Sequence, residues 1–158
     1  MDEFLTVSFI LKAFAVWIGI YFLQPILFVL RDKALDWYVR RYVLTEALDR
    51  AIMMRAADVW VINNRGKAAK ITASSDATTY YLDDVVVTEK QYAEYERMMH
   101  THIKREAKCA RLIRNRQFQL TRLFHHYKQE TKNPIPDWEK EAYEHQEAIH
   151  KRQDRHSQ

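Results

Sequence analysis

Hydrophobic residues are concentrated in one run near the N-terminus of the chain. Residues 13–30 carry no formal charge, and three charged residues then follow together at 31–33. As a helix rising 1.5 Å per residue, this run is roughly 27 Å long, close to the hydrocarbon thickness of about 30 Å. We therefore predict a transmembrane anchor over residues 1–31. A core helix of a soluble domain and a helix covered by other proteins are the alternatives, but residues 31–158 offer no obvious set of apolar helices to surround it.

The flanks of this run predict how the anchor sits. Pro25, next to Gln24, is expected to bend the helix at a polar point that contacts another membrane helix. Basic residues follow the run, whereas the first eleven residues hold none. By the positive-inside rule, the N-terminus then lies outside a bacterial or mitochondrial inner membrane, and the body lies in the cytoplasm or matrix. The residues expected in the membrane or at its interface, aromatic, polar and basic, are Trp17, Tyr21, Gln24, Pro25, Arg31, Lys33, Trp37, Arg40 and Arg41.

Apolar positions recur at helical spacing in two segments of the polar body. Residues 32–58 contain no Gly or Pro and predict an amphipathic juxtamembrane helix, expected to continue directly from the anchor. Thr88 and Gln91 form a capping box that begins a long helix over 88–132. Its apolar residues recur every three or four positions, like the a and d positions of a coiled coil. We expect this seam to pack on the first helix, on another subunit, or on both.

The two remaining segments are less regular. Residues 59–87 contain β-branched runs, which predict a small two- or three-stranded sheet with a turn near 64–66 and a flexible loop over 71–78. Residues 133–158 begin with Asn-Pro-Ile-Pro, a stiff linker, and continue as a polar helix. Because so polar a helix is marginal alone, we expect it to fray or to dock on a partner through Trp138.

These elements predict a fold that is mainly α. A single N-terminal transmembrane helix precedes a long helical hairpin or coiled-coil-like body with a small β insert. The composition agrees, because the chain has only 2 Gly and 3 Pro. Rossmann units, β-sandwiches and Gly-rich phosphate loops need more turn residues than this. The single cysteine excludes an intramolecular disulfide and a Cys-rich zinc site.

Candidate chemistry is sparse. The seven histidines form no HExxH pattern, and Glu147 with His150 is the one Glu-x-x-His pair, whereas a di-iron bundle needs two. Cys109 lies between Lys108 and Arg111, but no histidine stands three or four residues away to activate it. The sequence therefore predicts no enzyme, no metal and no cofactor.

Charge is the clearest signal in the body. Residues 31–158 hold 24 Lys and Arg against 19 Asp and Glu, a net charge of +5, and the cations concentrate on the long helix. The first interpretation of this charge is a solvated helix face; contact with an acidic subunit comes next, and attraction to anionic lipid or nucleic acid follows. Since Lys and Arg occur all around the helix, nucleic acid is the least favoured partner. The residues expected to bind partners are Tyr92, Tyr95, Met99, Ile103, Lys104, Lys108, Arg111, Arg114, Phe124 and Trp138.

The expected function follows from these features. We interpret the chain as a non-catalytic, membrane-anchored accessory or assembly subunit of a larger membrane complex, such as secretion, respiratory or phage-type machinery. One alternative is a small oligomerising membrane effector, holin-like or an exclusion protein, for which Ala15 and Gly19 supply a weak small-xxx-small spacing. The other is a membrane-tethered nucleic-acid-binding protein.

Overall fold

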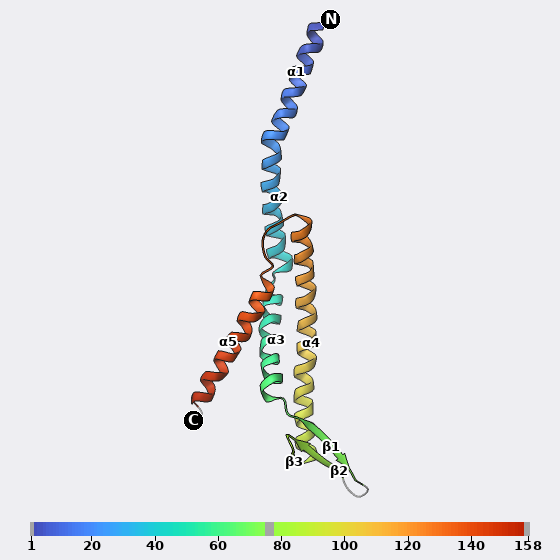
Figure 1. Ribbon diagram of the computed structural model, residues 1–158, viewed down its shortest axis with the longest axis vertical. Helices are drawn as coiled ribbons and strands as arrows, with labels where there is room; N and C mark the ends of the chain where they lie inside the picture. The colour runs from blue at the N-terminus through green and yellow to red at the C-terminus, as the bar shows by residue number, and fades with distance from the viewer. Residues whose placement is uncertain (1, 75–77, 157–158) are drawn as a thin grey trace. The chain divides into compact units, whose positions relative to one another are not determined.

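The computed structural model describes residues 2–74 and 78–156 of the chain. The chain divides into two compact units, residues 1–43 and residues 44–158. Helices dominate both units, and the second unit also holds a small antiparallel sheet (Figure 1). The predicted fold class, mainly α with one long apolar N-terminal helix and a small β insert, is confirmed.

The first unit is a continuous helical segment. It consists of α1 (Asp2–Ile18), η1 (Gly19–Leu23), α2 (Gln24–Tyr38) and η2 (Val39–Val43). The backbone N–H of Gln24 donates to the carbonyl of Gly19, so η1 is a wide π turn directly before Pro25. Proline lacks an N–H and its ring crowds the preceding turn, which a π turn relieves. A distortion thus lies directly before Pro25, and the helix changes direction between α1 and α2 in Figure 1.

This segment exposes its apolar side chains. Val7–Val43 includes an 18-residue window with a mean hydropathy of 2.1, and none of that window is buried. It is the one described helix that is long and apolar enough to cross a membrane. The backbone of a helix satisfies its own hydrogen bonds, so such a segment is stable in hydrocarbon. The prediction of one candidate membrane-spanning helix is confirmed.

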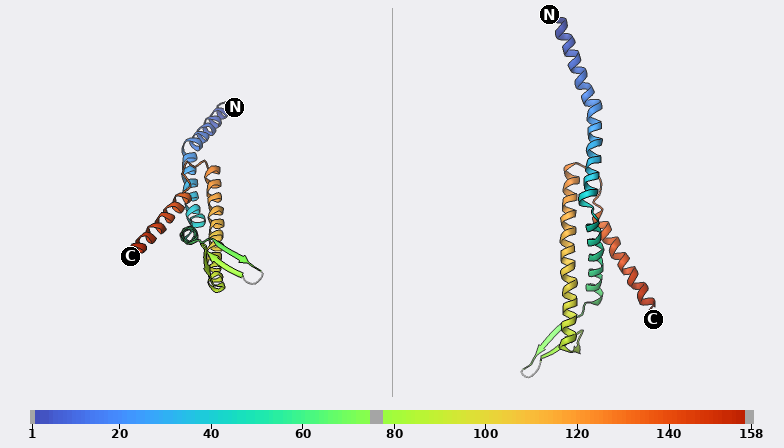
Figure 2. Two further views of the ribbon diagram at one scale, coloured as in Figure 1. Left: turned by 60° about the horizontal axis from the view of Figure 1, so that its bottom comes forward. Right: turned by 180° about the vertical axis from the view of Figure 1, so that it is seen from behind.

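The second unit is built on a helical hairpin. The helices α3 (Glu46–Arg65) and α4 (Glu89–His126) run side by side, and α5 (Ile135–His156) contacts α3 but diverges from it toward its own C-terminal end (Figures 1 and 2). Their facing sides supply the core. The fully buried apolar side chains of this unit are Leu48, Ile113, Leu120 and Ile135.

A small sheet lies between α3 and α4 in the sequence. It joins β1 (Ala69–Ala73), β2 (Thr78–Leu82) and β3 (Val85–Val87) in antiparallel order. Asp83 and Asp84 make the two-residue turn between β2 and β3, both with positive φ. Two positive φ values define a type I′ turn, and Asp tolerates them better than most residues. Asp83 also accepts a hydrogen bond from the Ala68 N–H at 2.8 Å.

Three predicted boundaries before α4 are wrong. Residues 59–65, expected to form a strand and its turn, complete α3 because they continue its apolar face. The helix predicted over residues 32–58 does continue from the anchor, but it is interrupted at residues 44–45. Thr45 is extended there, and its carbonyl accepts hydrogen bonds from the N–H groups of Leu48 and Asp49 in the first turn of α3. The predicted loop over 71–78 is in part strand, and its residues 75–77 lie outside the described part of the chain.

The ends of α4 have specific causes. At its start, the Thr88 hydroxyl accepts from the Gln91 N–H and the Gln91 side chain accepts from the Thr88 N–H, so the predicted capping box is confirmed. The helix stops at His126, before the predicted residue 132. Lys128 takes a left-handed φ of 53°, and its N–H and that of Gln129 donate to the carbonyls of His125 and Phe124. This Schellman motif ends the helix.

Candidate functional site

The first unit carries aromatic clusters on an exposed helix. Trp17 stands against Tyr21 with ring centroids 5.3 Å apart, and Trp37 against Tyr42 at 5.8 Å. All four rings are exposed, as are Gln24 and Pro25. Amphipathic rings of this kind suit the headgroup region of a bilayer.

The basic flank of the first unit is partly neutralised. Arg31 pairs with Asp32 at 2.8 Å and Arg40 with Asp36 at 3.0 Å. The four basic residues predicted for the interface, Arg31, Lys33, Arg40 and Arg41, are all exposed. Lys33, Trp37 and Arg41 line one open hollow of about 830 Å³. Aromatic and basic groups are therefore side by side on this surface.

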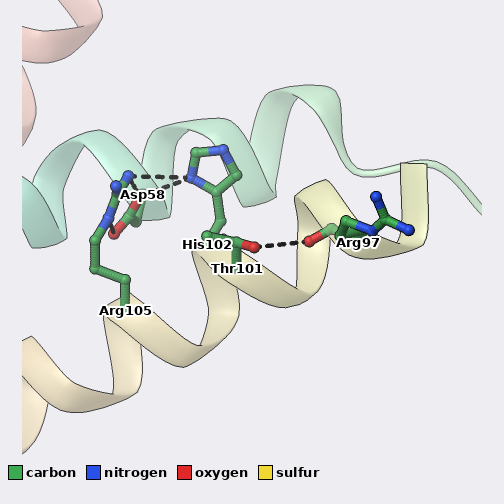
Figure 3. A network of polar contacts seen from close by, with 5 residues as sticks. All are labelled: Asp58, Arg97, Thr101, His102 and Arg105. Carbon is green, nitrogen blue, oxygen red and sulfur yellow. Dashed lines mark hydrogen bonds and ion pairs between the residues drawn. The ribbon is translucent and has the colours of Figure 1, made fainter. Parts of the chain in front are cut away.

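A buried carboxylate lies at the centre of the second unit. Asp58 of α3 is fully buried, and α4 supplies its two partners (Figure 3). The Nε of Arg105 donates to Oδ2 at 2.7 Å, and Nδ1 of His102 lies 2.7 Å from Oδ1. His102 and Arg105 are three residues apart, so both point from one face of α4.

The electrostatics of this cluster favour the ion pair. Burial alone would raise the pKa of the Asp58 carboxyl, but the hydrogen bonds with Arg105 and His102 outweigh burial and hold this pKa below its ordinary value. The same hydrogen bond raises the pKa of Arg105. The Asp58 carboxylate thus links α3 to α4 through two side chains of α4.

A second network joins all three body helices. Arg55 of α3 donates to Glu106 of α4 at 2.9 Å and also pairs with Glu139 of α5. Gln117 of α4 donates to the other oxygen of Glu139 at 2.8 Å. Burial lowers the pKa of Arg55, but the two carboxylates raise it, and the net shift is upward. Nearby, Trp60 stacks on His150 at 3.5 Å between centroids, so α5 docks within the chain.

The predicted partner-binding residues differ in how far they are buried. Tyr92 is buried against Tyr80, and the Tyr95 hydroxyl donates to the Lys67 carbonyl at 3.1 Å, so both serve contacts inside the chain. Met99 and Phe124 are half-buried. The exposed members are Ile103, Lys104, Lys108, Arg111, Arg114 and Trp138.

The exposed cations in the C-terminal part of α4 have few acids near them on the helix. Between Arg97 and His126 the only carboxylate is Glu106, which is engaged by Arg55. Lys104, Lys108 and Arg111 follow at steps of four and three and share one face. Arg105, between them in the sequence, turns inward to Asp58. The structure therefore leaves a cationic surface on α4 facing away from its partner helix.

An open groove lies between α3 and α5. It has a volume of about 630 Å³, with Ile52, Trp138 and Ala142 among its apolar residues. Glu46, Asp49 and Glu141 also line it, with His145, and no lysine or arginine does so among the described residues. The groove is thus acidic in a chain whose net charge is +4.

The structure offers little for chemistry. The Asp58–His102 contact resembles the acid–imidazole half of a catalytic triad, but Arg105 occupies the same carboxylate. Burial raises the pKa of the Cys109 thiol, and the Asp58 carboxylate adds to that rise, so the thiolate form is disfavoured. No group of three or more His, Cys, Asp and Glu side chains suited to a metal ion lies in the described residues.

Sequence reasoning missed the two polar networks. Asp58 follows Leu48, Ala51 and Ile52 on the apolar stripe of α3, at a position where that stripe demands an apolar residue. A charge on a core stripe was the available signal. Its partners on α4 could not be identified, because the register of two helices is a tertiary property.

The fold and these surfaces together define a class of protein: a helical body that carries one candidate membrane-spanning helix. Comparison with known protein families, with curated protein sequences and with solved structures finds no match.

Proposed function

We propose that the chain is a non-catalytic, membrane-anchored accessory or assembly subunit of a larger membrane complex. One observation carries this proposal: the window of the apolar helix that is long enough to span is wholly unburied, although the body has a complete core of its own. Exposed apolar area of that size is costly in water and favourable in a bilayer. The anchor would hold the body at a membrane surface, where its task is to bind neighbours.

The orientation and the membrane belong to the same proposal. Lys33 and Arg41 follow the apolar window and are exposed beside Trp37, which supports a C-terminal body in the cytoplasm or matrix of an inner membrane. The hollow formed there suits phosphate headgroups of anionic lipid. A reporter fused after Gln158 should be active only on the cytoplasmic or matrix side, and activity on the other side alone would reverse the orientation.

The exposed cations of α4 support binding to an acidic partner subunit. Between Arg97 and His126 the only carboxylate of this helix is Glu106, which Arg55 engages, so an acidic neighbour would gain from complementary charge. Nucleic acid would gain from the same charge, but it predicts a steep fall of affinity with salt.

The experiment that tests the function is purification of the tagged full-length chain from detergent-solubilised native membranes, with identification of the chains that accompany it. We expect stoichiometric partner subunits. A variant with Lys104→Glu and Lys108→Glu should lose an acidic partner, whereas Lys140→Glu with Lys151→Glu, the same charge change on α5, should retain it. A chain that purifies without any stoichiometric partner would overturn the proposal.

A further inference from the structure

We propose that copies of this chain associate head to tail, with an arginine-flanked phenylalanine on α4 of one copy seated in the groove between α3 and α5 of the next. This contact goes beyond the proposed function, because it needs no partner subunit. It would make the chain a self-assembling element at the membrane surface. Both halves of the contact are present in every copy.

The first half is an exposed aromatic patch, which we call the Phe118 patch: Arg114, Phe118 and Arg122. Phe118 is 62% exposed on an otherwise polar face, and the Arg122 guanidinium lies 5.5 Å from its ring centroid. The three residues stand four apart, so they follow one face of α4 at steps of about 6 Å. A large apolar ring with an arginine one turn away on either side is typical of an interface anchor.

The second half is the groove already described. Its floor includes Ile52, Trp138 and Ala142, and Trp138 is 37% exposed. Asp49 on α3 and Glu141 on α5 stand on opposite walls, both exposed, and neither has an ion-pair partner among the described residues. Glu46 is paired with Arg50, although both side chains are more than 70% exposed, so that pair is weak.

The two halves match in chemistry and in length. An apolar floor between two carboxylates fits an aromatic ring between two guanidinium groups. Residues 114–122 cover about 12 Å of helix, and the part of α3 that lines the groove, residues 46–53, covers about 11 Å. An acidic partner protein would satisfy the arginines but would leave the acidic groove uncovered. A second copy satisfies both surfaces, and this decides the occupant.

The geometry of the contact sets how it assembles. Because the patch and the groove are different surfaces, the interface is heterologous, and repeating it gives a ring or an open filament. One helix face in one groove buries less than a stable complex usually needs, so the contact is weak in dilute solution. Confinement of the copies to one membrane raises their effective concentration and compensates for this.

The test uses the full-length chain in lipid vesicles, with donor and acceptor fluorophores on C-terminal tags, and energy transfer is measured before and after nuclease treatment. Wild-type copies should show energy transfer above that of randomly mixed lipids. The patch variant, Arg114→Glu with Arg122→Glu, and the groove variant, Asp49→Lys with Glu141→Lys, should each lose about tenfold in association. Mixing the two variants should restore transfer, because each reversed surface then faces a complementary one.

Two controls separate this contact from general charge effects. Arg97→Glu with Lys104→Glu makes the same charge change on α4 outside the patch and should leave transfer intact. Phe118→Ala should weaken association about tenfold, whereas Ile103→Ala, also exposed on α4, should not. Circular dichroism of each variant verifies that it is folded.

Three results would overturn the inference: wild-type transfer no higher than random or lost on nuclease treatment, folded variants that associate like wild type, or folded variants that do not recover on mixing. The proposed function is tested separately from this contact. Native membranes that yield no partner subunit, together with energy transfer that follows the expected pattern, would remove the proposed function and leave this contact standing.

Discussion

The two units of the chain differ in which side chains they expose and which they bury. In the first unit, large apolar side chains from Val7 to Leu30 face outward along a single helix. In the second, a carboxylate is fully buried and every buried polar side-chain atom of the described residues has a hydrogen-bond partner. An exposed apolar helix suits lipid, whereas a body with a buried, fully hydrogen-bonded polar core suits water. The contrast distinguishes the candidate membrane-spanning helix from the charged body.

The largest effect should come from charging the first unit. Ile20→Arg with Leu23→Arg places two arginines near mid-bilayer, which costs roughly 6 kcal/mol at about 3 kcal/mol each and should abolish insertion. The matched control is Val85→Arg with Val86→Arg on β3, which are equally exposed but belong to the water-facing unit. Alkaline extraction of membranes measures both. If the Ile20/Leu23 variant stayed in the membrane pellet, the first unit would not be a span.

A core truncation should affect only the second unit. Leu120→Ala removes a fully buried side chain of α4 and should destabilise the body by about 3 kcal/mol. Leu27→Ala makes the same change on an exposed position of the first unit and should leave the unfolding of the body unchanged. Urea titration in detergent, followed by circular dichroism, compares them. Equal effects of the two would mean that the span shares the core of the body.

The buried ion pair should show an asymmetry. Arg105→Met leaves Asp58 buried with His102 alone, and we expect a loss of about 2 kcal/mol, less than for a fully enclosed pair because Arg105 is nearly half exposed. The neighbouring Lys104→Met removes an exposed cation and should change stability by less than about 0.5 kcal/mol. The same urea titration measures both. Similar values for the two would show that the Asp58 cluster contributes no specific stability.

The smallest expected effect is on pH dependence. The pKa of Asp58 is lowered in the folded chain, so its contribution is complete above its unfolded pKa of about 3.9 and is lost as the pH falls through the folded value. Asp58→Asn should therefore flatten the loss of stability below about pH 4. Asp36→Asn, at an exposed pair in the first unit, is the control and should leave that slope unchanged. Identical slopes in all three chains would remove Asp58 from the acid response.

Much of the fold could be read from the sequence because its signals are local. The 18-residue uncharged run predicts an apolar helix whatever surrounds it, and the Thr88–Gln91 capping box fixes the start of α4 through two hydrogen bonds within one turn. Pro25 predicts its own distortion for the same reason. Local signals failed at 59–65, where β-branched residues suggested a strand and packing against α4 made a helix.

The candidate surfaces depend on neighbours and could be predicted only in part. The cations of α4 are visible in the sequence, but the structure decides that Arg105 turns inward to Asp58 while Lys104 and Lys108 stay exposed. Tyr92 belongs to the predicted seam, yet its ring packs against Tyr80 of the sheet. The groove beside Trp138 exists only because α5 contacts α3.

The sequence alone thus determined which segment suits lipid, because hydropathy and helix length are sums over consecutive residues. The tertiary structure decided which polar groups are buried inside the body and which remain exposed at its surface. Asp58 and Glu139 lie far from Arg105 and Arg55 in the chain, and helix register brings each pair together. Register depends on the simultaneous packing of three helices, and no window of neighbouring residues contains that information.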